Sequence, residues 1–242
     1  MPIKVENKSC TECSGRSSSM FCSLKSTELT DVSLDKTSNI YKKGQVIFTE
    51  GHLAQNVFCI TSGKVKIFKT GTDGKEQIVG FAKEADLIGH EGILLERNYF
   101  VSAIALEETI VCAIPKHSID KLLESNNGFS ADIIKMLTKG LTISQQSVLD
   151  MAQKSARERT AGALLMLLDM YGTHVITKTI NTNLTRVEIA SIAGTSTESC
   201  IRILSEFHKE NLVSFLGKSI KILSIPKLKI VANDVELLPL IL

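Results

Sequence analysis

Cysteine is the residue in this 242-residue chain whose spacing most clearly suggests chemistry. Three of the six cysteines, Cys10, Cys13 and Cys22, lie in a short, polar, Ser-rich N-terminal segment without hydrophobic periodicity. Because no apolar signal segment is visible, we expect reduced thiols, metal ligands or redox sensors rather than a disulfide framework. The pattern alone predicts an arm that is either flexible or ordered by a metal.

Glu198 and Arg202 form a second candidate site, because they lie four residues apart and therefore on one face of a predicted helix. An arginine can donate to O6 and N7 of guanine together, and a glutamate can accept from N4 of cytosine. Thr197 and Ser199 can contact phosphate or a thymine methyl group. The alternative is that Glu198 closes a capping box with Thr195 and pairs with Arg202.

The elements around this pair predict a helix-turn-helix. Thr185 and Glu188 form the capping box that begins a first helix, and Gly194 ends it by adopting the left-handed conformation. A second helix is predicted over residues 197–210, directly after this short turn. Residues 215–220 then indicate a small β-hairpin.

The segment from Tyr41 to Pro115 has the texture of an all-β domain. Regularly spaced glycines separate short alternating runs, and Asp73-Gly74 predicts a hairpin turn. Such spacing is typical of a sandwich, barrel or jelly roll. The predicted strands are 46–48, 57–60, 64–68 and 110–114.

From Asn126 onward the hydrophobic period becomes helical. One heptad seam comprises Ile134, Leu137, Leu141, Ser144, Val148 and Met151. This seam indicates either a coiled-coil dimer interface or an amphipathic helix packed on the β domain. A basic link with a hinge near Ser155 and a buried helix over Ala161–Tyr171 follow, and Thr173–Thr182 is read as a strand or loop.

Composition excludes several classes of protein. A net charge of +2 means that any nucleic-acid surface must be local, and the absence of Trp argues against a platform for stacking single strands. No apolar run is long enough to span a membrane. No catalytic constellation is visible, and a thiol oxidoreductase using Cys10 and Cys13 lacks the necessary βαβ context.

At residues 185–204 the sequence closely resembles the Crp/Fnr family of bacterial transcription regulators. The stretch follows the family pattern T-R-x-E-I-A-x-x-x-G-x-S-x-E-T-x-x-R-x-L, with Ser199 in place of the second threonine. Residues 43–45, 62–63 and 156–163 support the resemblance, which covers nearly the whole chain.

The resemblance implies an α+β fold with an N-terminal cyclic-nucleotide-binding-type β jelly roll, a long dimerisation helix and a C-terminal winged helix-turn-helix. We expect a cysteine arm at 1–24, a β-roll sensor domain at 25–125, the dimerisation helix at 126–154 and the DNA-binding domain at 155–242. The expected protein is a cytoplasmic homodimer that binds a near-palindromic DNA operator and RNA polymerase, with no membrane partner and no enzymatic activity. The expected DNA-binding residues are Thr185, Arg186, Ser196, Thr197, Glu198, Ser199 and Arg202.

The expected effector pocket departs from that of the cyclic-AMP members of the family. Gly89 is followed by His90 and Glu91 instead of Gly-Glu, and Tyr99 and Phe100 occupy the positions of the phosphate-binding Arg-Ser pair. A buried cyclic phosphate needs a cation and hydroxyl donors, so we do not expect cyclic AMP. The alternative function is a regulator of the same fold that responds to another small effector or haem in this pocket, or to none.

The segment around Cys112 resembles the Fnr branch near its fourth cluster-binding cysteine. Cys10 and Cys13 align with the first two ligands of that branch. Eight residues then precede Cys22, where the Fnr branch has five, and Ser19 stands at the expected position. The longer loop adds only about a few tenths of a kcal/mol to the entropy of closure.

This resemblance implies a [4Fe–4S] cluster that senses oxygen or nitric oxide. Cluster binding is expected to order the arm, which has few apolar residues of its own. A zinc site, a thiol redox switch and an inert remnant remain alternatives, and Cys59 and Cys200 are interpreted as core residues. The implied cluster ligands are Cys10, Cys13, Cys22 and Cys112.

Overall fold

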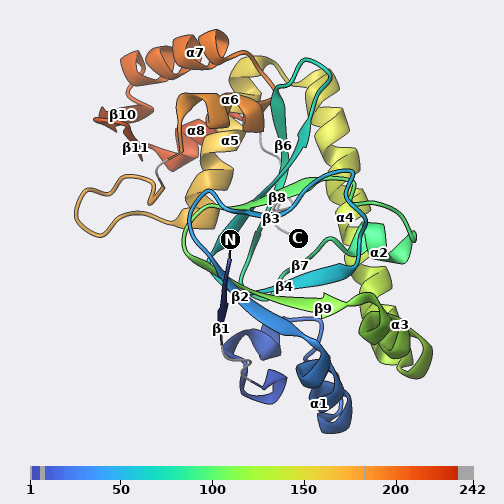
Figure 1. The fold of residues 1–242 in the computed structure, drawn as a ribbon. Helices are drawn as coiled ribbons and strands as arrows, with labels where there is room; N and C mark the ends of the chain where they lie inside the picture. The colour runs from blue at the N-terminus through green and yellow to red at the C-terminus, as the bar shows by residue number, and fades with distance from the viewer. Residues whose placement is uncertain (1, 6–8, 183, 234–242) are drawn as a thin grey trace. The chain divides into compact units, whose positions relative to one another are not determined.

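The computed structural model describes residues 2–5, 9–182 and 184–233 (Figure 1). The chain forms two compact units, divided at Thr70/Gly71, Ile78/Val79 and Leu141/Thr142, and each is described by itself. Parts of the expected arm and of the expected DNA-binding domain lie outside the described residues. Among the described residues, no helix has both the length and the hydrophobicity needed to cross a membrane.

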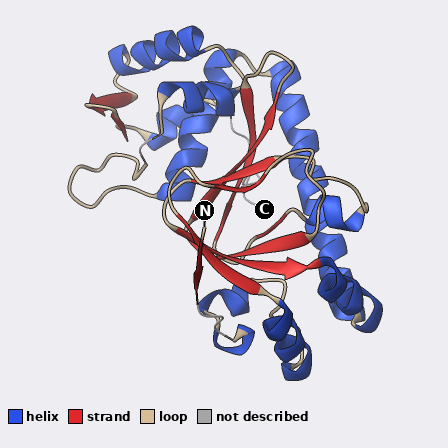
Figure 2. Ribbon diagram, in the orientation of Figure 1, coloured by secondary structure: helices blue, strands red, loops and turns tan. Residues whose placement is uncertain are grey.

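Antiparallel strands build the β domain, and Figure 2 shows their arrangement in two sheets. The larger sheet has the order β1 (Ile3–Val5), β2 (Thr37–Tyr41), β9 (Thr109–Pro115), β4 (Asn56–Ser62) and β7 (Leu87–Ile88). The smaller has the order β3 (Val46–Phe48), β8 (Ser102–Ala105), β5 (Lys64–Thr70) and β6 (Glu76–Lys83). All four predicted strands are confirmed, as is the hairpin turn, where Gly74 has a φ of 78°.

Aromatic side chains fill the core of the β domain. The ring of Phe48 lies 5.2 Å from that of Phe58 and 4.4 Å from that of Tyr99, measured between centroids. Phe58 is opposite Ala113 in the pairing of β4 with β9, so both side chains point to this face of the sheet. Residues of β4 and β9 with the other parity, including Cys59, therefore point to the opposite face.

The long helix α4 (Asn127–Gln153) confirms the helical period that begins near Asn126 (Figure 1). Its side chains Phe129 and Ile133 are buried, while the predicted seam is exposed. Ile134, Leu141 and Val148 are 63%, 59% and 69% exposed. The helix therefore packs on the β domain through one face and leaves the heptad seam uncovered in the single chain.

The remaining helices of the first unit are short. They are α1 (Ser26–Asp35), α2 (His90–Leu94) and α3 (Lys116–Ser125). The second unit contains α5 (Ala156–Tyr171), α6 (Arg186–Ala193), α7 (Thr197–Lys209), β10 (Val213–Leu216), β11 (Ser219–Ile222) and α8 (Ile225–Val231). Ser155 is the N-cap of α5 and receives a hydrogen bond from the backbone N–H of Glu158, so the helix break lies at the predicted hinge.

The N-terminal arm is anchored by apolar side chains, which corrects the expectation that it has too few to order itself. Its two 3-10 turns are η1 (Cys10–Glu12) and η2 (Ser14–Ser18). Phe21 and Leu24 are 6% and 3% exposed and belong to the core of the β domain. The ring of Phe21 stacks on that of Phe129 at 5.9 Å between centroids.

We expect Phe21→Ala to detach the arm, because truncation of a buried aromatic side chain costs about 3–5 kcal/mol. Limited proteolysis should then cut the arm at protease concentrations that leave the wild-type arm intact. Leu34→Ala is the matched control, because the Leu34 side chain is 78% exposed. This substitution should leave the cutting rate unchanged. Equal protection of the Phe21→Ala and wild-type arms would contradict this anchoring role.

Candidate nucleic-acid interface and thiol cavity

The helix-turn-helix is held by the predicted capping residues. The backbone N–H of Thr185 donates to a carboxylate oxygen of Glu188 at 2.8 Å, and the backbone N–H of Glu188 donates to the Thr185 hydroxyl at 3.2 Å. Gly194 ends α6 with a φ of 59°, in the left-handed region. Ser196 begins α7 by accepting from the backbone N–H of Ser199 at 3.1 Å. Two helices joined by this short turn confirm the motif.

The buried face of α7 comprises Cys200, Ile203, Leu204 and Phe207, whereas Ile201 and His208 are exposed. Cys200 is fully buried, so its interpretation as a core residue is confirmed.

Glu198 and Arg202 are both exposed on α7. Arg202 donates to a carboxylate oxygen of Glu206 at 2.7 Å, so the alternative in which it pairs with Glu198 is wrong. Hydrogen bonds from its own backbone N–H and from the Ser196 hydroxyl hold the pKa of Glu198 below its usual value. This keeps the carboxylate ionised, as an acceptor from an amino group requires.

The other predicted DNA-binding residues include side chains with local structural roles. The Thr185 hydroxyl serves the cap of α6, and the Arg186 guanidinium lies 5.0 Å from the centroid of the Phe215 ring. Thr197 and Ser199 are half-buried. Among these residues Glu198 and Arg202 are therefore the ones whose position and exposure best suit contact with base edges.

Arg159 supports the turn of this motif, a role that the sequence interpretation missed. Its guanidinium donates to the carbonyl oxygens of Ala193 at 2.9 Å, Gly194 at 3.1 Å and Lys154 at 2.5 Å. The bonds to Ala193 and Gly194 satisfy carbonyl groups at the end of α6, where helical partners are missing, and the bond to Lys154 reaches the residue after α4. The basic composition of the predicted link was the one sequence signal for this residue.

A second cluster of chemistry-bearing side chains lies in the β domain. One small cavity of about 30 Å³ is lined by four cysteines together with apolar and polar side chains. Cys10 and Cys13 come from the arm, Cys59 from β4 and Cys112 from β9. Three of the four implied cluster ligands therefore face one cavity.

Polar groups surround the sulfur of Cys112. The amine of Lys36, the hydroxyl of Ser38 and the hydroxyl of Thr61 each lie 3.4 Å from this Sγ. Lys36 is 4% exposed. Burial lowers the pKa of its amine, whereas interactions with Cys112 and Cys10 raise it. Together these interactions outweigh the effect of burial, so the pKa of Lys36 lies above its usual value.

Cys59 packs against the hydrophobic core, as the sequence interpretation expects, and it also faces the thiol cavity. It is only partly buried by its neighbours and lines the same cavity. Burial raises the pKa of its thiol, and the nearby sulfurs of Cys112, Cys13 and Cys10 raise it further. The signal that could have revealed it is the alternation of β4, which places Cys59 on the face opposite Phe58.

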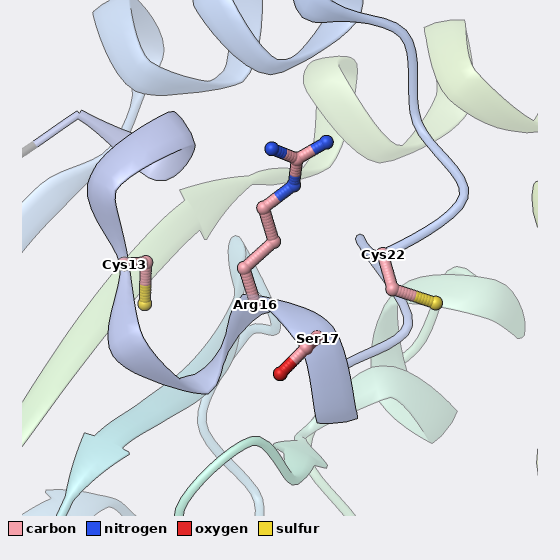
Figure 3. A pocket seen from close by; sticks show the side chains of 4 residues that line it. All are labelled: Cys13, Arg16, Ser17 and Cys22. Atoms are coloured by element: carbon pink, nitrogen blue, oxygen red, sulfur yellow. The ribbon is translucent and has the colours of Figure 1, made fainter.

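Cys22 is exposed and is absent from the lining of this cavity. It borders a separate surface hollow with Cys13, Arg16 and Ser17. Figure 3 shows the Arg16 side chain between the two cysteines and the sulfur of Cys22 pointing away from Cys13. In the described part of the chain, no three Cys, His, Asp or Glu side chains are already close enough to bind a metal ion.

Aromatic side chains occupy the expected effector pocket. Tyr99 is buried, and its hydroxyl donates to the carbonyl oxygen of Asn56 at 2.8 Å. A Cβ atom on Gly89 would lie 3.1 Å from the Tyr99 ring. His90 is 5% exposed, with Nδ1 3.2 Å from a backbone carbonyl oxygen. Phe100 is 38% exposed and lines an open surface hollow together with Tyr99. Glu91 lies beside His90, with 3.7 Å between the carboxylate and Nε2.

Two segments of the chain match known domain families. Residues 39–126 match the cyclic nucleotide-binding domain and residues 158–230 the Crp-like helix-turn-helix domain. The chain is 32% identical to the transcriptional activator protein Anr of Pseudomonas aeruginosa, over 75% of each chain. It is 30% identical to the fumarate and nitrate reduction regulatory protein of Yersinia pestis, over 80% of each chain.

A solved structure has the same fold. FixK2 from Bradyrhizobium japonicum superposes with a TM-score of 0.70 at 23% identity, covering 81% of this chain and 96% of that one. Helix-turn-helix geometry, matching domains and these relatives agree with the resemblance seen in the sequence. The chain therefore belongs to the Crp/Fnr family and is a DNA-binding transcription regulator of the Crp/Fnr type.

Proposed function

We propose that this regulator senses oxygen or nitric oxide through an iron–sulfur cluster bound at the thiol cavity. The observation that carries the proposal is the convergence of Cys10, Cys13 and Cys112 on one cavity beside the buried amine of Lys36. Thiolates suit iron–sulfur clusters, and hydrogen bonds to their sulfurs tune the reduction potential. The donor set of this chain therefore fits such a group, which when bound supplies a redox-sensitive centre.

The arm is connected to the first turns of α4. Besides the stacking of Phe21 on Phe129, the hydroxyl of Ser23 donates to a carboxylate oxygen of Asp132 at 3.3 Å. Asn126, directly before α4, donates to Glu28 at 3.0 Å. A change in how the cysteines hold the arm would therefore reach the helix that carries the exposed seam.

Dimerisation through this seam would couple the arm to DNA binding, because the dimer presents two recognition helices. The exposed apolar side chains of α4 suit a two-fold coiled coil. Two recognition helices would then enter successive major grooves about 34 Å apart on a near-palindromic operator. Contact with RNA polymerase at the promoter completes the proposed function.

Arg202→Ala should weaken specific operator binding by about 1–3 kcal/mol and relax preference at one base pair of each half-site. Arg202→Lys is the matched variant, because it keeps the positive charge but loses the two-pronged contact to guanine. We expect it to restore part of the affinity without restoring the base preference. Both are measured by a mobility-shift titration against wild-type and substituted operators. Unchanged base preference in both variants would contradict the role of Arg202.

Anaerobic reconstitution of the full chain with ferrous iron and sulfide tests the sensing proposal. The expected product has a broad visible absorption band and about four iron atoms per chain. Zinc-only binding would show metal content without colour, and would contradict the proposal. Colourless, iron-free protein would also contradict it, and would favour a regulator that responds to another effector or to none.

A further inference from the structure

Two cysteines lie side by side on neighbouring strands of the larger sheet. Cys112 on β9 pairs with Cys59 on the neighbouring strand β4, and with Ser38 on its other neighbour, β2. Opposite residues of antiparallel strands project to the same face of a sheet. The three side chains therefore form a row across the sheet, on the face opposite Phe58.

The cysteine arm covers this row. The backbone N–H of Cys10 donates to the hydroxyl of Ser33 in α1 at 2.8 Å, which fixes η1. Cys10 and Cys13 from the arm then line the cavity together with Cys59 and Cys112 from the sheet. Cys10 begins η1 and Cys13 lies between η1 and η2, whereas Cys59 and Cys112 come from paired strands.

The amine of Lys36 lies beside this row. It is 4% exposed and donates to Cys112 Sγ at 3.4 Å. Sulfur ligands gathered around one cavity are the donors that thiophilic metal ions prefer. The four cysteines therefore form a candidate donor set for such a metal.

We propose that Cys59, rather than Cys22, completes the metal-binding thiol set of this chain with Cys10, Cys13 and Cys112. This inference rests on the proposed function for the identity of the natural metal centre, but the thiol set itself can be tested separately. The sulfurs do not yet stand at ligating distance in the described structure, so binding draws the two arm cysteines toward the sheet. Cys22, on the far side of Arg16, stays outside.

Cadmium is a probe of the thiol set that does not depend on iron–sulfur assembly. With one equivalent of Cd²⁺, the ultraviolet charge-transfer absorption reports the number of bound thiolates. We expect Cys59→Ala to lose about a quarter of this absorption, since one of four thiolates is removed, and Cys22→Ala to lose none. In parallel, iron reconstitution should fall in Cys59→Ala and persist in Cys22→Ala.

A measurement on the wild-type chain covers the case in which Cys59→Ala fails to fold. Alkylation followed by peptide mass analysis, with and without Cd²⁺, should show that the metal leaves labelling of Cys22 unchanged. Metal-dependent protection of Cys22 would overturn the inference, as would equal absorption losses in the two variants. Wild type that binds Cd²⁺ through four thiolates yet takes up no iron would support the thiol set and refute iron–sulfur sensing.

Discussion

Leu141→Glu should convert the protein to a monomer. Leu141 is 59% exposed at the middle of the seam of α4. In a two-fold coiled coil, the substitution places two carboxylates opposite each other across the interface. Because a monomer presents one recognition helix instead of two, operator affinity should fall by at least about a hundredfold, or about 2.7 kcal/mol. Light scattering and an anisotropy titration with operator DNA measure the two effects.

Leu149→Glu is the matched control for this prediction. It makes the same chemical change on the same helix, at an exposed side chain outside the heptad seam. We expect it to remain a dimer with wild-type operator affinity. A dimeric Leu141→Glu protein, or dissociation caused equally by both substitutions, would contradict the assignment of the seam.

Cys112→Ser should abolish most iron uptake, from about four atoms per chain to less than one. This sulfur contacts the buried amine of Lys36, and it lies on a strand rather than in the arm. A metal site built from the arm alone would not need it. Iron analysis and the visible spectrum after anaerobic reconstitution provide the measurement.

Cys200→Ser is the matched control, because it removes a fully buried thiol from the helix-turn-helix. Its iron content should equal that of wild type, even if its thermal stability falls. Retention of iron by Cys112→Ser would contradict the thiol cavity as the cluster site. Loss of iron by both variants would instead indicate a folding defect, which their melting curves would reveal.

The order of elements could be predicted because its signals are local. Thr185, Gly194 and Ser155 mark helix ends through hydrogen bonds or backbone conformations that involve only a few neighbouring residues. The partner of Arg202 could not be predicted in the same way. Glu198 and Glu206 are both four residues away, and sequence spacing does not distinguish them.

The thiol cavity could be predicted only in part. Resemblance identified Cys10, Cys13 and Cys112. Cys59 lies 53 residues before Cys112 in the chain, and only the pairing of β4 with β9 brings the two together. Strand register over such a separation depends on the whole sheet. The buried position of Lys36 is likewise a tertiary effect that its polar surroundings in the sequence conceal.

Sensing in the thiol cavity is tested by measuring operator binding of one anaerobically reconstituted sample before and after exposure to air. We expect the cluster-loaded protein to be dimeric and to bind at least about tenfold more tightly, or by about 1.4 kcal/mol, than the same protein after cluster loss. Sedimentation measured on both states should show dissociation on exposure. Equal affinity and equal oligomeric state before and after air would contradict a sensor in the thiol cavity.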